Sequence, residues 1–105
     1  MIDLTIDGGY ANLRRGVSVA EDGAATCRLG GIVSTKRVSS TELERMVDDL
    51  ENSGLFASDG TFEADGADLQ RYVLAYDGAT VTAYDGAIPR ALQRTIDTLE
   101  ALLFS

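Results

Sequence analysis

Apolar and polar residues alternate strictly at the start of the chain. Ile2, Leu4 and Ile6 are separated by polar residues, and this period of two predicts a half-buried β-strand over residues 2–7. The alternation resumes at 16–19, which predicts a second strand. The glycine pair Gly8-Gly9 opens a loop between them.

A hairpin is predicted to follow the second strand. Glu21-Asp22-Gly23 fits a three-residue loop with Gly23 in the left-handed conformation, and this register pairs Val17 with Cys27. A two-residue turn would instead pair Val17 with Arg28. The first register separates apolar from polar side chains better, so it is preferred, and it makes Cys27 a core residue.

The stretch after the third strand permits two interpretations. Gly30-Gly31 interrupts the strand, and residues 32–36 fit either a short extension or a loop. A helix is predicted next, because Ser39 and Glu42 have the spacing of a capping box. One apolar stripe runs along this helix, formed by Leu43, Met46, Val47 and Leu50. Gly54 suits the position after its C-terminus.

Residues 58–67 are rich in glycine and acidic residues and predict a loop, with Phe62 as its one apolar anchor. The alternating runs 69–76 and 79–84 flank Asp77-Gly78, which is the signature of a type I′ hairpin. That register turns Tyr72 and Tyr76 inward.

The chain is predicted to end in a helix whose first turn contains Pro89. Its apolar side is formed by Ile88, Leu92, Ile96, Leu99, Leu102 and Leu103. The predicted order is βββαββα. We therefore expect a two-layer α+β fold, a single domain over 1–105, in which about five mainly antiparallel strands carry two helices on one face.

The charge balance excludes several classes of function. The chain has 9 basic and 17 acidic residues, a net charge of −8, which opposes binding to nucleic acid or to an anionic membrane surface. It has no histidine, so catalytic centres that need a histidine and zinc sites with histidine ligands are excluded. No signal peptide or membrane span is visible in the sequence, so a cytoplasmic location is expected, with secretion still open if a leader has been removed.

No catalytic residue, metal site or cofactor is predicted. The carboxylates of Asp59, Glu63, Asp65 and Asp68 have the oxygen density of a calcium loop but not its spacing. Every acidic residue is predicted in a turn or on a polar face, where a catalytic pKa shift is not expected. The lone Cys27 is expected to be a small buried side chain.

The segment from Gly8 to Arg15 has a different character. A tyrosine and arginines on a glycine-bounded loop suit a binding hot spot. The alternative is that Tyr10 or Leu13 closes one end of the core while Arg14 and Arg15 pair with nearby acids. The residues alone leave both interpretations open.

Gly-Gly-Tyr-Ala-x-Leu-Arg-Arg at 8–15 resembles the segment after the first strand of the emfourin family, small bacterial inhibitors of thermolysin-like (M4) metallopeptidases. The resemblance continues through residues 40–47, Leu55-Phe56, 71–74, 80–85 and 88–92. The chain departs from that pattern at Tyr10, where the family has phenylalanine, at Asn12, and in a longer stretch from 21 to 38.

The resemblance implies a protein that blocks the active-site cleft of an M4 metallopeptidase by surface complementarity. Its binding surface would be Gly8, Gly9, Tyr10, Ala11, Asn12, Leu13 and Arg14. The alternative function is a non-catalytic interaction or accessory domain whose acidic surface serves solubility.

Overall fold

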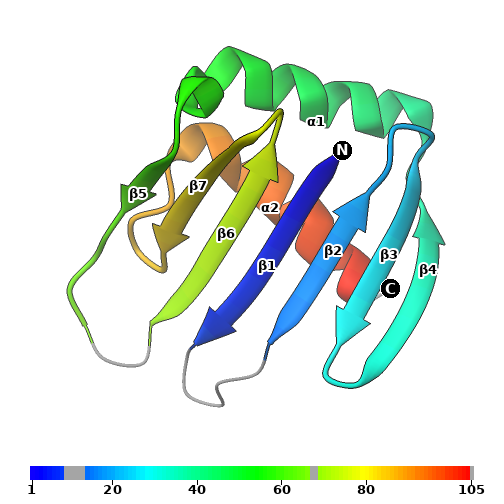
Figure 1. Ribbon diagram of the computed structural model, residues 1–105, viewed down its shortest axis with the longest axis horizontal. Helices are drawn as coiled ribbons and strands as arrows, with labels where there is room; N and C mark the ends of the chain where they lie inside the picture. Colours follow the sequence, from blue (N-terminus) through cyan, green and yellow to red (C-terminus); the bar gives the residue numbers. More distant parts are fainter. Residues whose placement is uncertain (9–13, 67–68, 105) are drawn as a thin grey trace.

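The computed structural model describes residues 1–8, 14–66 and 69–104. It is a two-layer α+β structure in which one seven-stranded sheet carries two α-helices on a single face (Figure 1). The strands lie in the order β4-β3-β2-β1-β6-β7-β5. All neighbouring strands are antiparallel except β5 and β7, which are parallel. The α+β class and its two-layer arrangement are as predicted, whereas the expected number of about five strands is wrong.

Strand β1 (Ile2–Gly8) occupies the centre of the sheet. It pairs with β2 (Arg15–Val19) on one side and with β6 (Gln70–Tyr76) on the other. Ile2, Leu4 and Ile6 point into the core and are at most 1% exposed. The alternating apolar residues of β1 therefore lie on one face of the strand, and that face is the buried one.

The hairpin between β2 and β3 (Ala24–Leu29) has the preferred register, with Val17 opposite Cys27. Gly23 has a φ of +89°, and a Cβ there would lie 2.5 Å from the carbonyl oxygen of Val38, so the position requires glycine. Cys27 is buried, as predicted.

The region left open after Gly30-Gly31 is a strand. β4 (Ile32–Arg37) pairs with β3 along its whole length and forms one edge of the sheet. Alternation of burial is absent in β4 because an edge strand without a helix over it exposes both faces. Ile32 and Val33 are 72% and 64% exposed.

Helix α1 (Ser40–Ser53) begins as its sequence predicts. The side chain of Ser39 accepts a hydrogen bond of 3.2 Å from the backbone N–H of Glu42. Gly54 is left-handed at the C-terminus, and Leu55 and Phe56 in the short helix η1 (Leu55–Ala57) fold back against the core.

The prediction of a loop over 58–67 is wrong in part, because the second edge strand of the sheet lies within it. Gly60–Phe62 forms β5, which pairs in parallel with β7 (Ala79–Tyr84). Three residues are too few for a visible period of two, so the pattern gave no sign of the strand. Phe62 packs against the core, as expected.

The β6–β7 hairpin follows the prediction in detail. Tyr76 pairs with Ala79, and Asp77 and Gly78 both have positive φ, as a type I′ turn requires. Tyr72 is buried, and Tyr76 is partly buried against the core.

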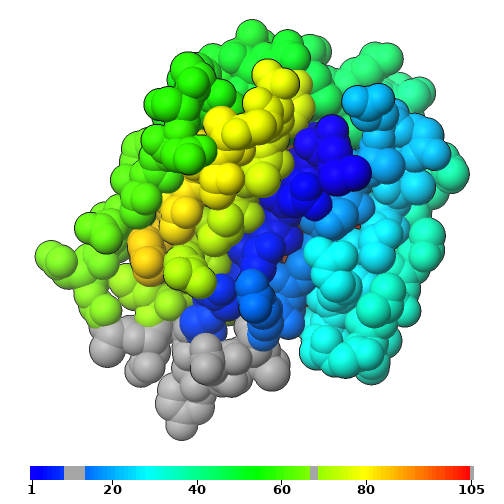
Figure 2. Space-filling model, in the orientation of Figure 1, coloured from blue at the N-terminus to red at the C-terminus, as the bar shows by residue number. Residues whose placement is uncertain are grey.

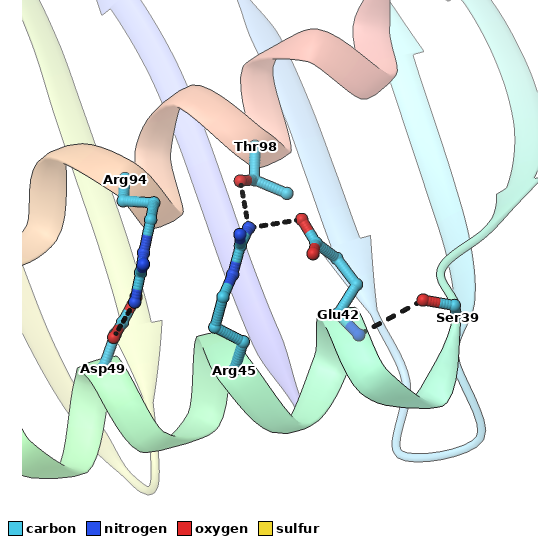
Figure 3. A network of polar contacts seen from close by, with 6 residues as sticks. All are labelled: Ser39, Glu42, Arg45, Asp49, Arg94 and Thr98. Carbon is cyan, nitrogen blue, oxygen red and sulfur yellow. Dashed lines mark hydrogen bonds and ion pairs between the residues drawn. The ribbon is translucent and has the colours of Figure 1, made fainter.

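Helix α2 (Arg90–Leu103) begins one residue later than expected, because Pro89 is its N-cap and not part of its first turn. The two helices are joined by polar contacts (Figure 3). Arg94 donates two hydrogen bonds, of 2.9 and 2.6 Å, to the carboxylate of Asp49, and these hold the pKa of that carboxyl below its usual value. Arg45 bridges Glu42 and the hydroxyl of Thr98.

The face of the sheet opposite the helices has no covering layer in the described residues (Figure 2). The strand register places on it a set of mostly polar side chains, many of them threonines: Asp3, Thr5, Asp7, Ser18, Thr26, Arg28, Val33, Thr35, Arg37, Arg71, Val73, Thr80, Thr82 and Tyr84. We call this surface the open face.

Candidate functional site

The predicted binding segment lies between the two central strands β1 and β2. Of its seven residues, the structure describes Gly8 and Arg14. Gly9, Tyr10, Ala11, Asn12 and Leu13 lie outside the described residues. The described part of the site consists of its two flanks and the surface beside them.

Gly8 is a fixed point at the end of β1. It pairs with Gln70 and has a φ of +77°, and a Cβ there would lie 2.8 Å from the carbonyl oxygen of Leu69. Both the backbone conformation and the close approach of β6 exclude a side chain. The segment thus starts from a rigidly defined residue.

The residue before this glycine is held by an ion pair across β1 and β6. Arg71 donates from Nε and Nη2 to the two carboxylate oxygens of Asp7, at 2.9 and 2.7 Å. This bond raises the pKa of the Arg71 guanidinium above its ordinary value. The fork-to-fork geometry fixes the direction of β1 at the point where the segment begins.

Arg14, at the other flank, is exposed and lines a hollow of about 250 Å³. Thr5, Gly16 and Arg28, which lie side by side across β1, β2 and β3, also line it, as do Arg15 and Gly30. Because Gly16 has no side chain, the guanidinium of Arg28 lies over it, with Nη2 at 3.0 Å from the position of a Cβ.

The guanidinium of Arg28 has a neutral partner, since its Nη2 donates to the hydroxyl of Ser18 at 3.2 Å. Together with Arg14 it makes this part of the surface basic in a chain of net charge −8. The arrangement can bind a carboxylate or another anion, because guanidinium groups present several N–H donors in a fixed plane.

Arg28 and Thr5 are site residues that the sequence prediction missed. The signal was present in the preferred hairpin register, which places Gly16 opposite Arg28. Because Gly16 has no side chain, the long side chain of Arg28 can lie across it on the uncovered face.

Of the acidic residues predicted as a calcium-like group, Asp59 makes a structural contact and Asp68 lies outside the described residues. Asp59, from the acidic loop, accepts a hydrogen bond of 2.8 Å from the backbone N–H of Thr80. Within residues 1–8, 14–66 and 69–104, no three side chains of His, Cys, Asp or Glu gather as metal ligands would. Burial raises the pKa of the Tyr72 hydroxyl, which donates to Gln70.

Across the described part of the chain, neither helix is both long enough and apolar enough to cross a bilayer. Comparisons with protein-family models, curated proteins and solved structures gave no significant match. We therefore infer function from the geometry of the sheet, the distribution of charge, and the short motifs of the sequence.

Proposed function

We propose that this chain is a protein inhibitor of thermolysin-like (M4) zinc metallopeptidases, which it blocks by inserting the segment from Gly8 to Arg14 into the active-site cleft. The observation that carries this proposal is that both flanks join the segment directly to paired strands, β1 at Gly8 and β2 at Arg15. One flank is Gly8, whose conformation and contact with Leu69 leave no alternative residue, and the other is Arg14 beside the hollow.

Fixed flanks matter because a binding segment loses conformational entropy when it docks. A segment joined to two central strands of a seven-stranded sheet has its ends ordered before it meets the enzyme. This preorganisation lowers the ordering cost of association and leaves more of the contact energy for affinity. The sequence resemblance at 8–15 supports the same surface.

The absence of histidine limits how such an inhibitor could approach the zinc. Only a carboxylate or a backbone carbonyl could come near the metal, so inhibition would rest chiefly on filling the cleft. Tyr10 is the largest side chain of the segment and the natural candidate for a hot spot.

The experiment is an inhibition titration of a purified thermolysin-like peptidase with a peptide substrate. We expect Tyr10→Ala to weaken inhibition by about 2 kcal/mol, roughly 30-fold, with an unchanged melting temperature. The matched control is Phe104→Ala, which removes an aromatic ring that is 63% exposed outside the segment and should leave inhibition unchanged. Equal inhibition by wild type and Tyr10→Ala would exclude the segment as the hot spot.

A further inference from the structure

The sheet ends on one side in a strand that is open to pairing. β4 is six residues long, contains no proline, and is exposed at nearly every position, including the two adjacent aliphatic residues Ile32 and Val33. The opposite edge, β5, has only three residues. Long exposed edges usually carry protection against pairing. β4 shows neither a bulge in its register with β3 nor a covering segment among the described residues, and its charged residues, Lys36 and Arg37, lie together at one end.

The hydrogen-bond pattern identifies which groups of β4 face outward. The N–H of Val38 donates to the carbonyl of Gly23 at 2.8 Å, so these two residues form a hydrogen-bonded pair at the end of the ladder. Because such pairs alternate along antiparallel strands, residues 36, 34 and 32 bond to β3. The backbone N–H and C=O groups of Val33, Thr35 and Arg37 therefore point away from the sheet.

Charge is segregated toward this edge. Residues 14–38 contain five of the nine basic residues of the chain but only two of its 17 acidic residues. Two of the five, Lys36 and Arg37, lie on β4 itself, and the other three lie in or beside β2 and β3. Elsewhere, Arg45, Arg71 and Arg94 each pair with a carboxylate. Arg37, in contrast, donates from Nη1 to the backbone carbonyl of Asp22. The acceptor of that bond is neutral, so the bond does not pair the charge of Arg37 with a carboxylate.

We propose that β4 is a docking edge for an extended acidic segment of a partner protein, which adds to the sheet as an eighth strand. The order of residues along β4 specifies that segment. Aliphatic side chains would lie opposite Ile32 and Val33 at one end, and carboxylates would lie opposite Lys36 and Arg37 at the other. Backbone bonds to Val33, Thr35 and Arg37 would provide the pairing, and the charges would provide the selection.

A second copy of the chain fits this edge less well. Antiparallel pairing of β4 with itself would set Lys36 and Arg37 of one copy opposite Val33 and Ile32 of the other, so the basic side chains would face aliphatic ones and not carboxylates. The docking edge β4 does not include the segment between β1 and β2, so pairing at this edge is independent of peptidase inhibition.

The test is a titration followed by the amide signals of the isotope-labelled chain. The probe is a six-residue peptide of two glutamates, two threonines and two valines, in that order, so that antiparallel pairing sets the glutamates against Arg37 and Lys36. We expect shifts and slower hydrogen exchange at the amides of Val33, Thr35 and Arg37. A peptide with lysines in place of the glutamates should bind at least tenfold more weakly.

Two variants separate backbone pairing from charge. Thr35→Pro removes one outward N–H and leaves the bonds to β3 intact, so it should weaken binding at least tenfold, whereas the control Thr35→Ala should bind within twofold of wild type. If the proline disturbs β4, Arg37→Glu still tests the role of charge. This variant should bind the glutamate peptide more weakly and the lysine peptide more tightly than wild type does.

Equal binding of both peptides, or unchanged binding by Thr35→Pro with an intact β4, would overturn the proposal. Concentration-dependent shifts of the same amides without any peptide would also overturn it, because they would assign the edge to a second copy of the chain. Peptidase inhibition by Thr35→Pro should equal that of wild type, so each proposal can fail alone.

Discussion

The hydroxyl of Tyr76 on β6 donates a hydrogen bond of 2.8 Å to the carboxylate of Glu51 on α1. Burial of the hydroxyl, followed by this bond and the charge of Glu51, raises the pKa of Tyr76 from 10 to about 12. The ring of Tyr76 also meets that of Phe56 edge to face, with centroids 5.8 Å apart. The side chain of Tyr76 thus links the β6–β7 hairpin, helix α1 and the short helix η1.

This link predicts a loss of stability in alkali. Between pH 10 and 12 the unfolded chain loses the Tyr76 proton while the folded chain keeps it, so the contribution to stability is complete below pH 10 and is lost as pH rises through 12. Tyr76→Phe keeps the ring but not the bond, and should cost about 1 kcal/mol in urea unfolding at pH 8.

The stability difference between wild type and Tyr76→Phe should shrink as the pH rises above 10. Glu51→Gln is the control. The amide oxygen of glutamine can still accept the hydrogen bond from Tyr76, but the substitution removes the negative charge that disfavours the tyrosinate form. A difference that stays constant from pH 8 to pH 11.5 would contradict the assignment.

Gly8→Ala should destabilise the chain at the root of the candidate segment. The left-handed backbone costs about 1–2 kcal/mol for alanine, and the added Cβ would also press on the carbonyl of Leu69. Gly78→Ala is the matched control, since φ is +81° there but no atom lies within 4 Å of the added carbon. Urea midpoints should show a larger loss for Gly8→Ala; equal losses would mean that the close contact is easily relieved.

Thr95→Val should stabilise the chain. Thr95 is fully buried on α2, and its hydroxyl has no hydrogen-bond partner among the described residues. Replacing the hydroxyl with a methyl group of similar size removes that cost, so unfolding free energy should rise by about 1 kcal/mol. Thr98→Val provides the comparison, because its hydroxyl accepts a bond from Arg45 and its loss should lower stability. A destabilised Thr95→Val would indicate a partner for the hydroxyl in solution.

Much of the sheet could be predicted because its strands alternate and its turns carry specific residues. Gly23 fixed the register of Val17 with Cys27, and Asp77-Gly78 fixed the β6–β7 pairing. The edges could not be predicted in this way. β4 exposes both faces, and β5 is held by parallel pairing with β7, which is distant in sequence; neither produces a local pattern.

The candidate site was predicted as a continuous segment, whereas the surface beside it is assembled across strands. Gly8 is the last residue of β1, one residue beyond the predicted strand, and Arg14 directly precedes β2. The hollow also needs Thr5 and Arg28, which come from different strands. Such a surface depends on sheet register, so a motif search along the chain passes over it.

The most direct measurement is a stoichiometric titration of a thermolysin-like metallopeptidase with the intact chain, with and without a small zinc-binding inhibitor in the active site. We expect activity to fall to zero near one chain per enzyme, and the small inhibitor to compete with the chain for binding. Full activity at a large excess of the chain, or binding that the small inhibitor does not affect, would contradict this expectation.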